Sequence, residues 1–342
     1  YEVIGVDKDA FSRELDACGA DCFPRNDPEG FHLASDFREQ QSIIDLYKSC
    51  YPEKAIIDTE YHIMHYWIPV SAQHIKAMMW DGAVHGRSAA AIWVWGRNLE
   101  NPEHSIMNQP WCFEALAHSA LDLRRFSREI FALANVKPEV ALIYNGRGYL
   151  ESYEELYFTG IPFILLPDGR ITKENLERFK AIVAPKGAAV SDAAAMALEA
   201  YAKRGGRILG KKDSLLHNLY GDETPTRGVL GKVEFYDTAE TKNSGRILRE
   251  ILDKEDFATR PFRIVSRDNQ RLFVTWRAAK FDDAWLIFVI NYNREAREVI
   301  IKPVEGISIK DGVDLITGER VDLSLRLPSL EPALIRYRLD AR

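Results

Sequence analysis

Short apolar runs alternate along the first part of the chain with stretches whose apolar residues recur at helical spacing. The apolar runs predict three strands, at 19–24, 54–60 and 88–95. The helical spacing predicts four helices, at 9–18, 35–50, 71–84 and 110–135. Asp9 and Ser71 are typical N-terminal caps for two of these helices. Strands separated by helices predict βαβ units and therefore a parallel sheet.

A second and cleaner alternating series follows Pro138. Its apolar runs predict four strands, at 140–145, 162–167, 181–185 and 206–209. Between them the helical spacing predicts helices at 150–158, 172–179 and 190–204. Parallel strands with helices on both faces predict a doubly wound, flavodoxin-like sheet.

The last third of the chain has a different hydrophobic pattern from the first two thirds. A polar stretch from about 210 to 260 contains one predicted helix, at 244–254. After Pro261 the helical pattern stops, and strand patterns follow at 271–278, 284–292, 297–303 and 332–339. Strand patterns separated by turn residues predict an antiparallel β-sandwich. The predicted division is therefore residues 1–135, 136–235 and 236–342.

Composition agrees with a globular α/β protein. The chain has 342 residues, and a prior of about 150 residues per domain predicts two or three domains. Hydrophobic residues make up 46% of the chain and charged residues 28%, which excludes a disordered or collagen-like chain. The net charge of −6 argues against a nucleic-acid or anionic-membrane partner.

The ends and the cysteines add little chemistry. No charged-then-apolar leader precedes Tyr1, so we expect a cytoplasmic protein, and the missing Met is typical of part of a longer chain. The four cysteines, Cys18, Cys22, Cys50 and Cys112, all fall in the first third. They form no second clustered pair, so they are predicted to be buried thiols rather than a disulfide framework or metal site.

Glu60 is the strongest candidate for chemistry, because it ends an apolar strand in IIDTEYHIMHYW. In parallel α/β barrels the catalytic groups gather at the carboxyl ends of strands. Aromatic and histidine residues follow it closely: Tyr61, His62, His65, Tyr66 and Trp67. A carboxylate beside flat rings suits a sugar site, since the rings stack on the apolar face of the sugar. A helix-capping or ion-paired Glu60 is the structural alternative.

Other residues near the predicted strand ends are weaker candidates. His62 and His65 lie three apart, but no third ligand follows at fixed spacing, so a metal is not expected. Trp93 and Trp95 face the same way on a strand, either as a pocket wall or as core packing. Polar residues that either line the same site or lie on the solvated surface are Asp21, Glu100, Glu103, His104 and Glu114.

The middle domain lacks the residues that its own chemistry would need. Gly146 and Gly148 form a lone GxG, which no GxGxxG or phosphate-loop pattern extends. The segment APKGAAVS at 184–191 stands where a glutamine amidotransferase would carry a nucleophilic cysteine, and it has none. An assembly role is therefore favoured over an amidotransferase-like hydrolase.

Taken in order, these motifs resemble the C-terminal part of a glycoside hydrolase family 42 β-galactosidase. The segment DCFP at 21–24 matches the aspartate-x-aromatic-proline strand end of the family, and IIDTE at 56–60 matches its nucleophile strand. Trp67 is similar in position to a sugar-stacking tryptophan, and His85-Gly86 through Trp95 match a further motif. The resemblance runs over essentially the whole chain.

The resemblance implies a retaining (β/α)8-barrel glycosidase with Glu60 as nucleophile. The three regions then correspond to the last barrel strands, a flavodoxin-like trimerisation domain and a small β-domain. A β-glycoside is the implied substrate, with Trp67, Trp95, Asp21, His62, His65, Tyr61, Glu103 and His104 as implied substrate-binding residues. No cofactor or metal is implied, and a homo-oligomer, trimer or dimer, is expected.

The sequence also departs from the family pattern. Phe23 stands where the family usually has a tyrosine that can hydrogen-bond the nucleophile, and Glu103-His104 is the nearest match to its Glu-x-x-His sugar clamp. No Asn-Glu pair, which carries the acid/base of the family, occurs in the chain. About 130 residues hold three barrel strands rather than eight. An N-terminal barrel polypeptide is therefore an expected partner, and a non-catalytic carbohydrate-binding or assembly half is the alternative function.

Overall fold

The structure, a computed structural model, describes residues 7–24, 32–63, 70–93, 95, 106–144, 148–222, 232–236, 244–255, 257–267 and 272–339. The chain divides into two compact units. The first unit comprises Tyr1–Leu15, Asp45–Pro52 and Lys137–Phe257, and the second comprises Asp16–Ile44, Glu53–Val136 and Ala258–Arg342. The predicted boundaries at 135 and 235 stay predictions.

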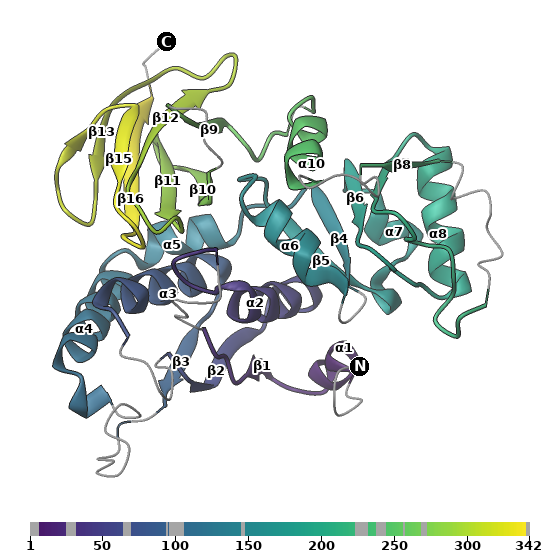
Figure 1. Ribbon diagram of the computed structural model, residues 1–342, viewed down its shortest axis with the longest axis horizontal. Coiled ribbons are helices and arrows are strands. Elements are labelled where there is room, and N and C mark those ends of the chain that lie inside the picture. Colours follow the sequence, from purple (N-terminus) through teal and green to yellow (C-terminus); the bar gives the residue numbers. More distant parts are fainter. Residues whose placement is uncertain are drawn as a thin grey trace. The chain divides into compact units, whose positions relative to one another are not determined.

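A three-stranded parallel sheet lies in the second unit (Figure 1). Its strands, in sheet order, are β1 (Ala17–Ala20), β2 (Ala55–Tyr61) and β3 (Ala89–Ile92). The predicted parallel pairing is confirmed, but two strands are shorter than predicted. The segment DCFP follows β1 instead of ending it, and β3 stops before Trp93. The β1–β2 pair is close at Gly19, where an added Cβ would lie 2.2 Å from the Ile57 carbonyl oxygen.

The helices of this part of the chain follow the strands as predicted. They are α2 (Arg38–Cys50), α3 (Ala72–His85), η2 (Ile106–Asn108), α4 (Pro110–Arg125) and α5 (Ser127–Ala134). The Ser71 hydroxyl accepts the His74 amide hydrogen and caps α3, and Gly86 ends it at φ 112°. The single helix predicted over 110–135 is instead two helices, because the backbone leaves helical geometry at Phe126.

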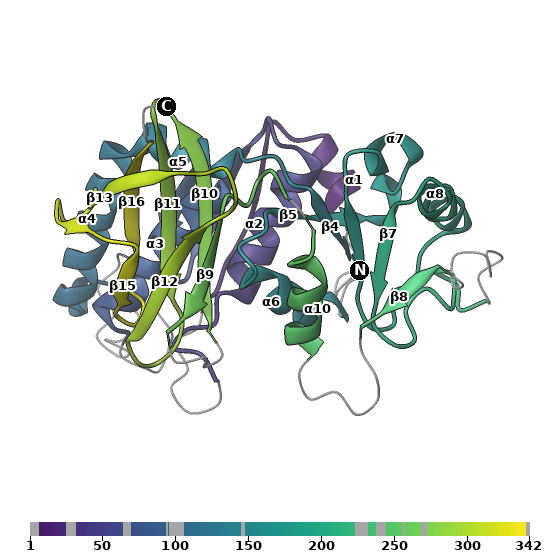
Figure 2. The same cartoon turned by 90° about the horizontal axis from the view of Figure 1, so that it is seen from above.

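Two antiparallel sheets complete the second unit and share one apolar core (Figure 2). The larger sheet contains, in order, β10 (Val274–Phe281), β11 (Ala284–Asn291), β16 (Ala333–Leu339), β13 (Ile309–Asp314) and β14 (Arg320–Val321). The smaller contains β15 (Ser324–Leu327), β12 (Arg297–Pro303) and β9 (Phe262–Ser266). The predicted antiparallel strands are confirmed, but the sequence pattern missed β9 and β13 to β15. The sandwich layout stays a prediction.

Buried polar bonds join α3 to these strands. The Tyr292 hydroxyl donates to a carboxylate oxygen of Asp81. The Arg277 guanidinium lies 2.9 Å from Nδ1 of His85. Because Asp81, His85 and Tyr292 are almost completely buried, these bonds satisfy polar groups that would otherwise cost stability. They fix the helix and the sheet in one arrangement within this unit.

The first unit contains a five-stranded parallel sheet. Its strands, in sheet order, are β5 (Phe163–Pro167), β4 (Val140–Tyr144), β6 (Ala181–Ala184), β7 (Arg207–Gly210) and β8 (Val233–Phe235). Counted along the chain this order is 2-1-3-4-5, which is the order of flavodoxin-like sheets. The accompanying helices are α1 (Lys8–Arg13), α6 (Tyr149–Tyr157), η4 (Asp168–Arg170), α7 (Lys173–Leu176), α8 (Asp192–Lys203) and α10 (Ser244–Leu252).

The start of α1 corrects one prediction. The side chain that caps the helix is Asp7, which accepts the Ala10 amide hydrogen at 3.1 Å. Asp9 lies inside the first turn and accepts three hydrogen bonds from Arg170, from Nη2 to Oδ1 at 2.8 Å and from Nε to Oδ2 at 3.0 Å and to Oδ1 at 3.2 Å. The carboxylate therefore links α1 to η4 instead of capping a helix. Among the described residues, no helix is both long and apolar enough to cross a membrane.

Candidate active site

Glu60 lies near the carboxyl end of β2 with its side chain 46% exposed. Its Oε2 atom lies 3.4 Å from Nε2 of His62, at the outer limit of a hydrogen bond. His62 directly follows β2, and this contact holds its ring beside the carboxylate. A half-exposed carboxylate with one oriented neighbour is accessible to a ligand and can act as a nucleophile or stabilise a positive charge.

The His62 ring is held from several sides. It is 5% exposed and stacks on Phe23, with ring centroids 4.0 Å apart and planes 18° apart. The Trp93 ring lies 5.7 Å away on a tilted plane. The backbone N–H of His62 donates to the Cys22 carbonyl at 3.0 Å. Residues that follow β1, β2 and β3 therefore converge on one imidazole, which in turn orients Glu60.

Asp58, which the sequence analysis missed, precedes Glu60 by two residues on β2. It is 2% exposed and accepts the Cys22 amide hydrogen at 3.3 Å. Burial raises the pKa of Asp58 to about 6, and the positive charge of Arg87 and the bond from Cys22 offset part of that rise. The available signal was a second acidic residue inside an apolar strand, where a carboxylate is costly unless it is paired.

Arg87 provides a buried positive charge next to this strand. Its guanidinium lies 4.2 Å from the centre of the Tyr61 ring and donates to the Met79 carbonyl at 3.2 Å. Tyr61 is completely buried, and burial raises the pKa of its phenol. Tyr61 is thus part of the packing under the site in this structure. Its predicted role in substrate binding stays a prediction.

Of the remaining predicted site residues, the structure describes Asp21 and Trp95. Asp21 accepts the Thr59 hydroxyl hydrogen at 2.8 Å. Trp95 is 47% exposed and contacts Phe113 edge to face at 5.7 Å. His65, Trp67, Glu103 and His104 lie outside the described residues.

The thiols and the possible metal ligands form no further site in the described parts. All four cysteines are described, buried and not joined by a disulfide. Burial raises the pKa of Cys112 to about 11, so this thiol is a poor nucleophile near neutral pH. Within the described ranges, no group of three His, Cys, Asp or Glu side chains is placed to hold a metal ion.

The carboxyl ends of the sheet in the first unit carry a buried ion cluster. Lys211, which is 1% exposed, lies 3.0 Å from a carboxylate oxygen of Glu155 and 3.0 Å from one of Glu151. The Tyr236 hydroxyl donates to the other oxygen of Glu155 at 3.4 Å. These bonds pair the buried ammonium with two carboxylates, so the cluster is explained by folding alone.

Comparison with known proteins shows which fold the chain has. No family model matches the chain, and no curated protein does. Among solved structures, an apo exo-carrageenase of family 42 (GH42) from Bacteroides ovatus matches with a TM-score of 0.78 at 21% identity. A catalytic mutant of a GH42 β-galactosidase from G. stearothermophilus matches with a TM-score of 0.72 at 17% identity, and the β-galactosidase from Bacillus circulans sp. alkalophilus with 0.69 at 12%. The chain has a GH42-like fold.

These matches cover almost all of this chain but only part of the solved proteins. They cover 98%, 98% and 97% of it, and 50%, 61% and 62% of the three structures. The chain thus spans about half to three fifths of their length. The GH42-like fold agrees with the resemblance found in the sequence, and identities this low establish the fold and not the reaction.

Proposed function

We propose that this chain carries the nucleophile of a retaining β-glycosidase of the β-galactosidase type, with Glu60 as that nucleophile. The observation that carries the proposal is the half-exposed Glu60 carboxylate near the end of a parallel strand, 3.4 Å from His62. The carboxyl ends of such strands are where barrel enzymes place their catalytic groups. The aromatic rings of Phe23 and Trp93 around His62 suit a sugar-binding surface.

The proposed reaction proceeds by double displacement. The Glu60 carboxylate attacks the anomeric carbon, and the bond from that carbon to the leaving oxygen breaks. An acid/base glutamate outside this chain protonates the leaving oxygen and then takes a proton from water. The water oxygen bonds to the anomeric carbon as the bond from that carbon to Glu60 breaks, which frees the carboxylate. His62 positions the attacking carboxylate, and Trp67 and Trp95 are the proposed stacking walls.

The barrel is proposed to be completed by an N-terminal barrel polypeptide of further βα units. Among the described strands, β3 pairs only with β2, so its other edge has no described partner. A groove of about 420 Å³ runs along β3 between α3 and α4, lined by Ile92, Trp95, Phe113 and other apolar residues. Natural proteins cover exposed strand edges and large apolar patches. Another parallel strand with its helix has the chemistry to fill this groove.

The first unit is the proposed assembly region. Its sheet order is that of flavodoxin-like domains, and its buried ion cluster is accounted for by folding. A trimer or dimer formed through this unit is part of the proposal. Sedimentation of the purified chain tests it, and a monomer at all concentrations would contradict it.

The nucleophile can be tested by covalent trapping. A 2,4-dinitrophenyl 2-deoxy-2-fluoro-β-D-galactoside has a leaving group that needs no general acid, so the absent acid/base does not prevent the first step. We expect mass spectrometry to find one fluorogalactosyl group on the peptide that contains Glu60. When the barrel is complete and the substrate is a β-galactoside, Glu60→Gln should lower turnover at least about 10³-fold.

A control variant and a mass measurement distinguish a glycosidase from a non-catalytic carbohydrate-binding half. Glu53→Gln changes an exposed carboxylate that precedes β2, at the opposite end of the strand from Glu60, and it should leave the labelling at Glu60 intact. Denatured intact mass of the natively purified protein shows whether a second polypeptide is bound. A complete barrel that binds galactosides but is never labelled would refute catalysis and establish the non-catalytic carbohydrate-binding half.

A further inference from the structure

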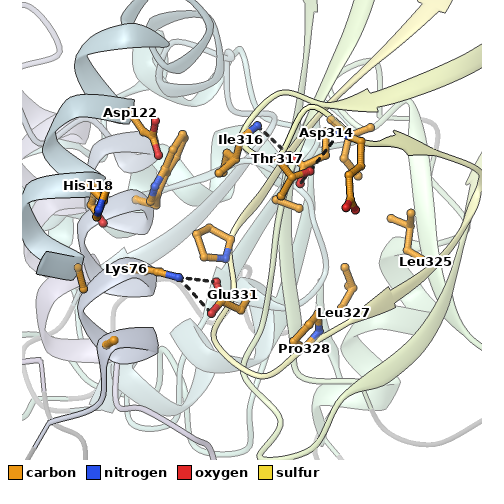
Figure 3. A pocket seen from close by; sticks show the side chains of 18 of the residues that line it. Lys76, His118, Asp122, Asp314, Ile316, Thr317, Leu325, Leu327, Pro328 and Glu331 are labelled. Carbon is orange, nitrogen blue, oxygen red and sulfur yellow. Dashed lines mark hydrogen bonds and ion pairs between the residues drawn. The ribbon is translucent and has the colours of Figure 1, made fainter. Parts of the chain in front are cut away.

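A second cavity lies within the second unit, apart from Glu60. It has a volume of about 710 Å³, and its walls are α3 and α4 on one side and the strands and turns from Asp314 to Ile335 on the other (Figure 3). None of Asp21, Phe23, Glu60, His62 and Trp93 lines it. The volume falls within the range of small-molecule sites.

The charges around this cavity favour a ligand that is not an anion. The lining carboxylates outnumber the lining permanent cations: Glu114, Asp122, Asp314, Glu319 and Glu331 against Lys76 and Arg326. Lys76 is already paired, because its Nζ lies 3.3 Å from both carboxylate oxygens of Glu331. Carboxylates accept hydrogen bonds, so this wall matches a neutral ligand rich in hydroxyl donors and repels sulfate groups.

Trp111 provides a flat apolar surface at the same cavity. Its indole N–H donates to the Val70 carbonyl at 2.8 Å, which fixes the plane of the ring. The residue nevertheless remains 47% exposed and lines the cavity. A ring held in this way can pack against the apolar face of a sugar without losing side-chain freedom on binding.

Ser119 is the residue that points most directly to a ligand. It lines the cavity, is 2% exposed, and its Oγ atom has no hydrogen-bond partner among the described residues. A helical serine usually bonds to the carbonyl one turn earlier, and a buried hydroxyl without a partner lowers stability. Less than 1 Å² of its Oγ atom is accessible, so the side chain has to rotate toward the cavity before a ligand hydroxyl can satisfy it.

We propose that this cavity is an accessory binding site for a neutral saccharide, with Trp111 as the stacking surface and Ser119 as a hydrogen-bonding group. The charge, the aromatic surface and the unpaired hydroxyl carry the inference. It rests on the proposed function only for the choice of a galactoside as the probe.

The test uses the full chain and β-1,4-galactotriose as the probe. Titration followed by nitrogen–proton spectra of the tryptophan indoles should shift the Trp111 signal, which Trp111→Phe identifies. Ser119→Ala should weaken this binding about 2- to 10-fold, the size of one hydrogen bond. Ser42→Ala is the matched control, because Ser42 is also a buried serine in a helix and does not line the cavity.

Two further titrations separate this site from the reacting centre. Glu60→Gln should leave the Trp111 shift unchanged. If Glu60→Gln abolishes saccharide binding while Ser119→Ala does not, the accessory site is refuted and the proposed function stands. A sulfated galactan trisaccharide should bind more weakly than the neutral one. The proposal also fails if the sulfated sugar binds more tightly, or if only a lysine-rich peptide shifts Trp111.

Discussion

The two parallel sheets of this protein differ in how completely they are covered. In the first unit, every residue of β6 is buried, and β4 is buried from Val140 to Ile143. In the second unit, β2 alternates between buried and accessible positions, and Ala89 and Ala91 of β3 are exposed. The first sheet has its core on both faces, whereas the second presents an uncovered side. The candidate chemistry lies on the uncovered sheet.

This difference originates in the strand sequences. A central parallel strand covered on both faces is a nearly continuous apolar run, and VALIY at 140–144 fits that description. The strand AIIDTEY at 55–61 instead contains two carboxylates, of which Asp58 is buried and Glu60 is half-exposed. Burying both would be costly, so the carboxyl end of this strand leaves Glu60 open to solvent, a ligand or a partner.

Truncating one isoleucine in each sheet should show the largest contrast. Ile182 in β6 is completely buried, so Ile182→Ala is expected to lower the free energy of unfolding by about 2–5 kcal/mol. Ile92 in β3 is half-buried and lines the open groove, so Ile92→Ala should cost less than about 1.5 kcal/mol. Urea unfolding followed by circular dichroism measures both. Equal losses would contradict the contrast.

Hydrogen exchange should resolve the same contrast strand by strand. Amides of β6, which pairs with β4 and β7, are expected to exchange at least about 100-fold more slowly than those of β3, which pairs with β2. Mass spectrometry of peptic fragments measures this difference. A partner that completes the barrel should slow the exchange of β3 and leave β6 unchanged, and protection of β3 without any partner would oppose the idea of an open edge.

The buried carboxylate of Asp58 predicts a smaller, pH-dependent effect. Its pKa is about 6 in the folded chain and 3.8 as the reference value, so folding favours its protonated form. The stability that this preference provides is present below about pH 4 and is lost as the pH rises to about 6. Asp58→Asn should remove at most about 3 kcal/mol of this decline. The comparison needs unfolding curves at pH 4 and pH 7, and a decline of the same size in both proteins would count against it.

Much of the fold could be predicted, because most strands and helices carry strong local patterns. Ser71 as the cap of α3 and the apolar runs of β4 to β7 are examples in which the sequence pattern and the tertiary environment agree. The break between α4 and α5 and the short late strands could not be predicted from local patterns. The pattern of α4 continues through Phe126, and the short strands β13 and β15 pair with β16 and β12, which are distant in the sequence.

The central residues of the candidate site could be predicted from the sequence, whereas the buried residues that pack beneath them could not. Glu60 and His62 stand out because of residue type and position at a strand end. Phe23 was noticed only as a departure from a family pattern, although it stacks on His62. Asp58 and Arg87 escaped notice because their importance comes from burial and mutual charge, which a sequence shows only after the strand register is known.

The missing side chain of Gly19 has a consequence for sequence variation. Even one methyl group there would collide with the Ile57 carbonyl and push β1 away from β2. The Cys22 carbonyl, which holds the amide of His62, lies three residues farther along the same segment. Position 19 should therefore be intolerant of change in any functioning descendant of this chain.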